Sequence, residues 1–216
     1  MKKFELTNDT KIVFGKKLFR IRALVSFGNV KKDELGGYVE KEENLSHVDN
    51  AWVYGDARVC GNARVYGDAR VCGDAWVYGD ARVCGNARVY GDARVCGNAR
   101  VYGDAWVCGN ARVYGDAEVC GDAWVYGDAR VCGDARVCGN ADYTCIKGFG
   151  TEYRNTTFYR QKDGSIGVKC GCFSGTIDEF REQVKNTREG KIAKEYLMIA
   201  DLMEYHFGKS EGVGDE

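Results

Sequence analysis

A six-residue pattern of alternating small apolar and polar positions dominates the chain. Fifteen units run without a gap over residues 51–140, each reading alanine, a variable residue, valine, tyrosine or cysteine, glycine, and aspartate or asparagine. A short fixed period is typical of solenoids, in which each repeat packs on its neighbours. The pattern predicts a β-solenoid over 45–140, with 45–50 as a degenerate first unit.

The alternation within each unit decides which side chains face inward. Successive strand residues point to opposite faces, and ten repeat arginines cannot line a dry core without partners. We therefore expect alanine and valine inside, with arginine, tryptophan, tyrosine and cysteine outside. Glycine and its Asp or Asn neighbour tolerate positive φ, so they form the bends.

The length of one coil follows from a resemblance. The unit resembles the hexapeptide repeat of left-handed parallel β-helices, where an aliphatic residue precedes a small one by four positions, as Val53 precedes Ala57. This resemblance implies triangular coils of about 18 residues, a little over five of them. The tyrosine–cysteine alternation repeats every twelve residues and leaves a two-sided twelve-residue coil open. We favour eighteen because the unit matches that family's unit.

The two coil lengths place different side chains in one column. An eighteen-residue coil aligns Trp52, Trp106 and Trp124, and a twelve-residue coil aligns Trp52, Trp76 and Trp124, so the tryptophans alone do not decide. With eighteen residues, cysteines on one wall lie two layers apart, about 9.6 Å. A disulfide spans less than about 7 Å. We expect no disulfide in the repeat.

The flanking segments break the period. Residues 1–50 predict an N-terminal β cap with the first coil, 51–140 the β-helix, and 141–216 a C-terminal α+β cap. Within the last segment we expect a hairpin turn at 162–164 and a disordered tail after Gly208.

Two helices are predicted near the C-terminus. Thr176 and Glu179 fit a capping box at the start of the first helix. A second helix over roughly 191–207 is expected to present another apolar surface. That surface would be formed by Tyr196, Ile199 and Met203.

Composition excludes several classes of function. The net charge is −1, and ten repeat arginines face ten repeat aspartates and one glutamate, so we do not expect nucleic-acid binding. No apolar run is long enough to span a membrane, and the N-terminal stretch lacks a signal-like apolar segment, which favours a cytoplasmic protein. The repeat cysteines form no CxxC pair and the repeat has no histidine, so no cofactor or metal is expected there.

Two places offer chemistry for ligand binding. Arg88, Trp106 and Trp124 would combine guanidinium and aromatic groups on the outer wall, which suits a nucleotide-type ligand. Gly175 and Thr176 precede a helix, where free amides can hold an anion. Two further residues, Cys170 and Cys172, are weak metal-ligand candidates.

Three segments together resemble known proteins. They are GGYVEKEENLSH before the repeat, the repeat itself, and GCFSGTIDEF after it. They resemble small hexapeptide-repeat proteins of Firmicutes and their phages and prophages, and the first two also resemble the YdcK-like β-helix proteins. The resemblance implies a β-helix with end caps and carries no established activity.

These observations lead to three functional hypotheses. The first is a non-enzymatic binding protein, phage- or prophage-derived, that counters host defence by capturing a host protein or a nucleotide signal. The second is an enzyme like the hexapeptide-repeat acyltransferases, for which His47 is the one candidate catalytic histidine. The third is a structural, self-assembling module. Exposed aromatic walls favour a homo-oligomer, a trimer or dimer.

Overall fold

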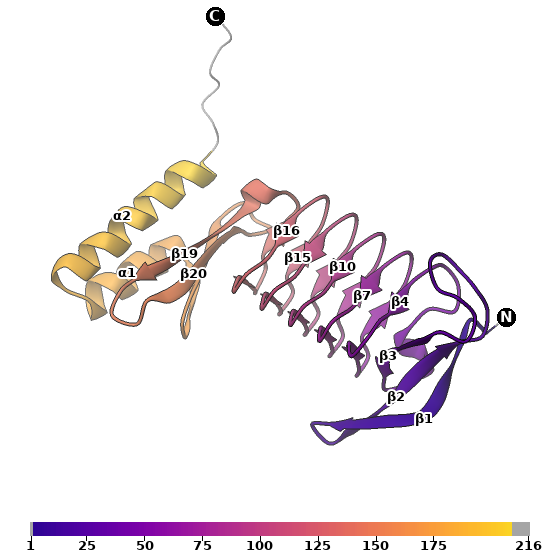
Figure 1. Ribbon diagram of the computed structural model, residues 1–216. Helices are drawn as coiled ribbons and strands as arrows, with labels where there is room; N and C mark the ends of the chain where they lie inside the picture. The colour runs from indigo at the N-terminus through magenta and orange to yellow at the C-terminus, as the bar shows by residue number, and fades with distance from the viewer. Residues whose placement is uncertain (1, 209–216) are drawn as a thin grey trace, which may run out of the picture. The chain divides into compact units, whose positions relative to one another are not determined.

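The computed structural model describes residues 2–208 and divides the chain into two units, Met1–Asn140 and Ala141–Glu216 (Figure 1). The first unit contains the repeat and everything before it. The second is a small α+β unit. The predicted disordered tail after Gly208 lies outside the described residues.

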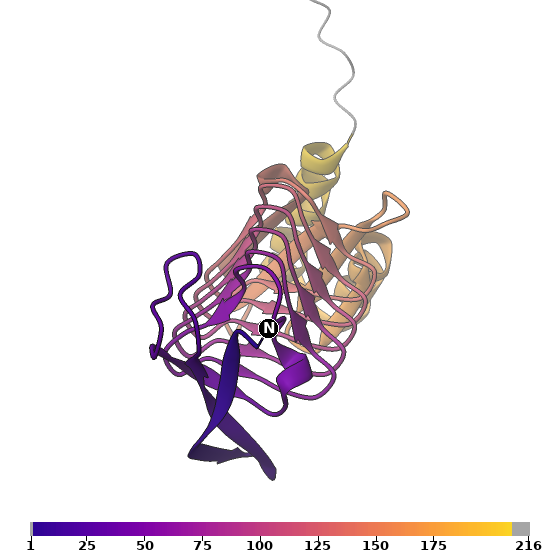
Figure 2. The ribbon, with the colours of Figure 1, turned by 90° about the vertical axis from the view of Figure 1, so that its right-hand side faces the viewer.

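The repeat folds into a parallel β-solenoid in which each unit contributes one two-residue strand (Figure 2). Strand partners lie 18 residues apart, as in Arg88 with Trp106, so the eighteen-residue coil is confirmed and the twelve-residue coil is excluded. The strands are Trp52–Val53 (β4), Arg58–Val59 (β5), Arg64–Val65 (β6), Arg70–Val71 (β7), Trp76–Val77 (β8), Arg82–Val83 (β9), Arg88–Val89 (β10), Arg94–Val95 (β11), Arg100–Val101 (β12), Trp106–Val107 (β13), Arg112–Val113 (β14), Glu118–Val119 (β15), Trp124–Val125 (β16), Arg130–Val131 (β17) and Arg136–Val137 (β18).

Three walls result, each a parallel sheet running along the solenoid. Wall 1 has the order β16-β13-β10-β7-β4, and wall 3 has the order β18-β15-β12-β9-β6. Wall 2 contains β5-β8-β11-β14-β17 and continues into three N-terminal strands. Every repeat alanine and valine is at most 1 % exposed, which confirms the predicted interior.

The bends require glycine. The glycines of units 51–134 have φ between 60° and 73°. Coils also stack closely there, since a Cβ on Gly67 would lie 2.9 Å from the backbone nitrogen of Gly85. A side chain at such a position would strain the backbone and collide with the next coil.

An antiparallel sheet covers the first edge of wall 2. Strands Phe4–Val13 (β1), Lys16–Ala23 (β2) and Leu35–Val39 (β3) follow one another, and β3 pairs in parallel with β5. Strand β3 therefore occupies the edge that the first coil would otherwise leave open for pairing with another chain.

The first coil differs from the prediction for 45–50. Leu45, twenty residues before its partner Val65, takes the place of a valine, and the backbone N–H of Ser46 donates to the Val65 carbonyl. The regular spacing of 18 begins at Trp52 with Arg70. Residues 45–50 are thus not an in-register unit, because they lack the glycine bend and accommodate two extra residues, with Asp49 at φ 54°.

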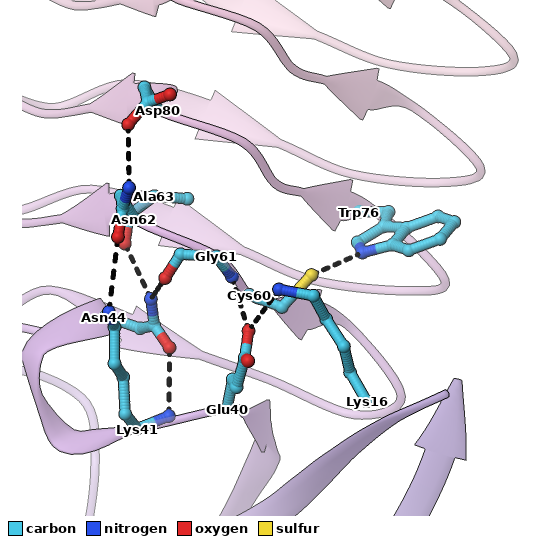
Figure 3. Close-up of polar contacts among 10 residues, drawn as sticks. All are labelled: Lys16, Glu40, Lys41, Asn44, Cys60, Gly61, Asn62, Ala63, Trp76 and Asp80. Carbon is cyan, nitrogen blue, oxygen red and sulfur yellow. Dashed lines mark hydrogen bonds and ion pairs between the residues drawn. The ribbon is translucent and has the colours of Figure 1, made fainter. Parts of the chain in front are cut away.

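Side chains satisfy the backbone where this coil departs from the ladder (Figure 3). The Asn44 amide, in the short 3-10 helix Glu42–Asn44 (η1), donates to the carbonyls of Gly61 and Ala63 at 3.1 and 2.8 Å. Glu40 accepts from the Gly61 N–H at 2.6 Å. The Asn44 contacts replace ladder bonds that a regular coil would supply to these two carbonyls.

The second unit pairs an antiparallel sheet with two helices. Its strands are Tyr143–Phe149 (β19), Arg154–Arg160 (β20), Ile166–Cys170 (β21) and Phe173–Thr176 (β22), preceded by the 3-10 helix Asn140–Asp142 (η2). The helices are Ile177–Thr187 (α1) and Gly190–Phe207 (α2). The predicted turn at 162–164 joins β20 to β21.

The predicted second apolar surface is wrong. Tyr196, Ile199 and Met203 pack with Phe158 and Phe180 in the core of this unit. The opposite side of α2 carries the exposed apolar residues. They are Met198, Leu202 and Tyr205, which are 61, 57 and 87 % exposed. The helical period was predicted correctly, but it does not tell which apolar stripe faces the sheet.

The expectation of no disulfide in the repeat is also wrong. Cys120 and Cys138 are bonded, with Cα atoms 4.3 Å apart. The strict alternation would put tyrosine at 138, but two consecutive units carry cysteine there, at Cys132 and Cys138. Cys138 therefore lies one coil, rather than two, from a cysteine on wall 3.

Candidate functional site

Wall 1 brings the predicted residues Arg88, Trp106 and Trp124 together. The Arg88 guanidinium lies over the Trp106 ring at 4.6 Å from its centroid. The Trp106 and Trp124 rings are 5.0 Å apart at 65°. Arg88, Trp106 and Trp124 occupy one outward position in three successive coils, because β10, β13 and β16 are neighbours in the sheet.

Tyrosines flank this row on the same wall. Tyr90 meets Trp106 edge-on at 5.9 Å. Trp124 is 45 % exposed and Tyr126 is 61 % exposed. We call Arg88, Tyr90, Trp106, Trp124 and Tyr126 the aromatic face. It is a surface on a regular backbone, so its side chains hold fixed spacings along the wall.

The repeat pattern predicts that every tryptophan is exposed, but some of them are covered. Trp52, on the same wall, is fully buried under the N-terminal segment, where Phe27 and Phe4 meet its ring edge-on. Trp76, on wall 2, is half-buried against Phe14. The segment that covers them lies outside the repeat, so the repeat pattern alone could not reveal this.

The predicted helix-start site is occupied by the protein itself. Thr176 and Glu179 form the predicted capping box, in which the Thr176 N–H donates to the Glu179 carboxylate at 2.8 Å. A Cβ on Gly175 would lie 2.5 Å from that carboxylate. Asp178 and Glu182 lie nearby. An anion would meet carboxylates here, so we base no proposal on Gly175 and Thr176.

Cys170 is the last residue of β21, and Cys172 lies in the two-residue turn that joins β21 to β22. The Thr156 hydroxyl donates to the Cys170 sulfur at 3.1 Å, and Cys172 is exposed. Within residues 2–208, no three His, Cys, Asp or Glu side chains gather closely enough to hold a metal ion.

The repeat cysteines alternate with tyrosines along each wall, except at the end of wall 3, where Cys120 is followed by Cys138. The Tyr78 phenol, for example, hydrogen-bonds with the thiol of Cys96 one coil further, and burial together with this bond raises the pKa of Tyr78 to about 12. Burial also raises the pKa of the Cys60 and Cys72 thiols. A raised pKa leaves little thiolate near neutral pH, so these two cysteines are not activated nucleophiles.

The two extra residues of the first coil create a pocket on wall 3. It has a volume of about 570 Å³ and lies between the segment Glu42–His47 and strands β6 and β9. We call it the N-terminal pocket. Its lining includes the polar residues Glu43, Ser46, His47, Arg64, Tyr66 and Arg82. Sequence reasoning missed it, and the absence of a glycine bend in 45–50 was the available signal.

His47 has both ring nitrogens engaged or covered. Its Nδ1 accepts from the Lys3 backbone N–H at 3.2 Å, and its buried Nε2 faces the Glu42 carboxylate at 3.6 Å. The ring stacks on Phe4 at 4.3 Å. A catalytic base must reach the proton that it removes, and His47 presents neither nitrogen to a ligand.

Comparison with known families agrees with this architecture. Six overlapping segments match the YdcK beta solenoid repeat. They are residues 57–73, 63–79, 69–85, 81–95, 93–109 and 105–121. The fold thus defines a repeat β-solenoid protein. No curated protein matches the chain. None of the helices within residues 2–208 combines the length and the apolar character needed to span a membrane.

Proposed function

We propose that the chain is a non-enzymatic binding protein that recognises a partner protein through the aromatic face. The observation that supports this most directly is the exposure of Trp124 and Tyr126, 45 and 61 %, next to the half-buried Trp106. Tryptophan, tyrosine and arginine are the residues most enriched at interface hot spots. A regular β ladder holds them in place, so little ordering entropy is lost on binding.

A nucleotide signal is a second candidate ligand for this face. The Arg88–Trp106 pair supplies a guanidinium group for a phosphate and an aromatic ring for a base. The acyltransferase alternative loses support, because its one candidate histidine is His47 and both of its nitrogens are engaged or covered.

The phage or prophage origin and the counter-defence role remain part of the proposal. They rest on the resemblance of residues 36–47 and 171–180 to hexapeptide-repeat proteins of Firmicutes phages. A cytoplasmic location belongs to the same proposal.

A capture experiment with matched variants tests the protein partner. Wild type, the double variant Trp124→Ala/Tyr126→Ala and the control Tyr153→Ala are used as bait with lysate of the candidate host. Tyr153 is 67 % exposed and lies outside the solenoid. We expect a protein that is held by wild type and by the control but lost from the double variant. If the double variant holds the same proteins as wild type, the aromatic face is not the binding surface.

Thermal shift with cyclic and linear nucleotides tests the second ligand. A bound ligand raises the melting temperature by mass action. The effect should disappear in Arg88→Ala/Trp106→Ala and persist in Arg112→Ala, whose arginine is exposed on wall 2. If nucleotide raises the melting temperature equally in both variants, the aromatic face is not the nucleotide site.

A further inference from the structure

The N-terminal pocket contains two arginines that have no carboxylate partner among the described residues. Arg64 and Arg82 are exposed and directly paired in adjacent coils. Among residues 2–208, no ion pair involves either of them. Neighbouring strands lie about 4.8 Å apart, so two guanidinium groups can reach one anionic group.

The corner carboxylate nearest in the chain to these arginines is already engaged. Asp80, just before β9, accepts from the Asn62 amide at 3.0 Å (Figure 3). Glu42 pairs with Lys2 at 2.7 Å and faces His47. Arg64 and Arg82 therefore make no direct pair with these carboxylates among residues 2–208, although Glu43 also lines the pocket. An anion can bind the two guanidinium groups without breaking an existing pair.

Two other pocket residues determine which chemical group can be attached to the anion. Tyr66 follows Arg64 by two residues, so both side chains face outward on the same wall, and Tyr66 is 38 % exposed. Its ring offers a stacking surface. Glu43 is exposed and has no ion pair among the described residues, so it can accept from N–H or O–H donors.

We propose that the N-terminal pocket binds a small phosphate monoester that carries a planar ring with hydrogen-bond donors, the chemistry of a nucleoside monophosphate. Arg64 and Arg82 hold the phosphate in the charge-assisted geometry that guanidinium groups favour. Tyr66 stacks on the ring, and Glu43 accepts from its donors. A volume of about 570 Å³ lies within the usual range for small-molecule sites. This site lies on wall 3, and it does not depend on the aromatic face of wall 1.

Calorimetric titration of the full chain with nucleoside 5′-monophosphates and with inorganic phosphate tests the proposal. We expect Arg82→Gln and Arg64→Gln each to weaken nucleotide binding roughly tenfold or more, the size of a lost charged hydrogen bond. Arg94→Gln removes an exposed arginine at the same repeat position on wall 2, and it should change the affinity less than about twofold. Because all three positions are exposed, the variants should melt like the parent.

Two more variants test the ring. Tyr66→Leu and Glu43→Gln should weaken nucleotide binding and leave the affinity for inorganic phosphate unchanged. Arg88→Ala/Trp106→Ala should leave both affinities unchanged, which separates this pocket from the aromatic face. The proposal is overturned if no monophosphate binds at millimolar concentration, if Arg94→Gln weakens binding as much as Arg82→Gln, or if inorganic phosphate binds as tightly as every nucleotide.

Discussion

Single side chains satisfy the backbone polar groups of the first coil, and Lys3 is the buried charged residue among them. It is 4 % exposed, and its ammonium donates to the carbonyls of Ala51 and Asp49 at 2.8 and 3.2 Å. Burial lowers the pKa of Lys3 from 10.5 to about 8, although Asp49 opposes the shift. The residue thus satisfies two carbonyls and bears the cost of a buried charge below that pH.

The pKa of Lys3 predicts a pH-dependent contribution to stability. Between about pH 8 and 10.5 the unfolded chain binds more protons than the folded one, so the contribution of Lys3 to the free energy of unfolding rises with pH. Relative to Lys3→Met, wild type should gain on the order of 2 kcal/mol between pH 7 and pH 10. Other groups titrate in both proteins and cancel. Urea unfolding of both at the two pH values measures the gain, and equal pH profiles would contradict it.

Each strand of the solenoid has only two residues, so the column of valines behind it carries the packing. Val89, in the middle of wall 1, is fully buried and has Val71 and Val107 as neighbours. This interior was predictable from the sequence, because alanine and valine alternate with arginine in most units, and arginine cannot be buried without a partner.

Val89→Asp tests this packing. A buried carboxylate without partners should lower the free energy of unfolding by several kcal/mol. Val89→Ala should cost about 1–3 kcal/mol, because it leaves a cavity without a charge. Melting followed by circular dichroism gives both values. A Val89→Asp protein that melts like the parent would show that the valine does not face inward.

The Cys120–Cys138 bond ties the last two strands of wall 3 together. A disulfide that closes a loop of this length raises the free energy of unfolding by about 2–3 kcal/mol, mainly by restricting the unfolded chain. Cys120→Ser should lower the stability of the oxidised protein by that amount. Cys84→Ser, from the same wall, should change it less because Cys84 is free.

Non-reducing peptide mass spectrometry should find the 120–138 link. In a reducing cytoplasm the pair would be in the thiol form, so wild type and Cys120→Ser should differ little after reduction. An oxidised protein in which Cys120 and Cys138 both remain alkylatable would refute the assignment.

At the scale of the molecule, exposed apolar surface predicts self-association. Met198, Leu202 and Tyr205 form an exposed apolar stripe on α2, and such surface is rarely left uncovered in a soluble monomer. We expect a dimer or trimer by light scattering at tens of micromolar. Leu202→Glu should shift the mass toward the 23.9 kDa monomer, whereas the control Lys185→Glu, at an exposed position on α1, should not. A wild-type mass of 23.9 kDa would refute the prediction.

The inward alanine and valine positions follow from periodicity. The eighteen-residue coil, and with it the cluster of Arg88, Trp106 and Trp124, was predicted from the resemblance of the unit to the hexapeptide repeat, because the twelve-residue alternation left the coil length open. Outside the repeat, local signals such as the capping box at Thr176 and Glu179 predicted the C-terminal helices correctly, whereas contacts between distant segments were not predicted. The N-terminal pocket depends on two extra residues in one coil, whose pairing is non-local. The burial of Trp52 depends on a covering segment more than 20 residues away in sequence. Neither leaves a periodic signal.

The mismatch between a twelve-residue alternation and an eighteen-residue coil has a consequence for how such a protein can change in length. Removing or adding two units leaves every tyrosine beside a cysteine, because the alternation along the chain is unchanged. Because each coil has one unit per wall, every residue beyond that point nevertheless moves two walls around the solenoid axis. A change in the number of units between the N-terminal pocket and the aromatic face therefore changes the direction in which this face points relative to the pocket, while the packing inside the solenoid remains the same.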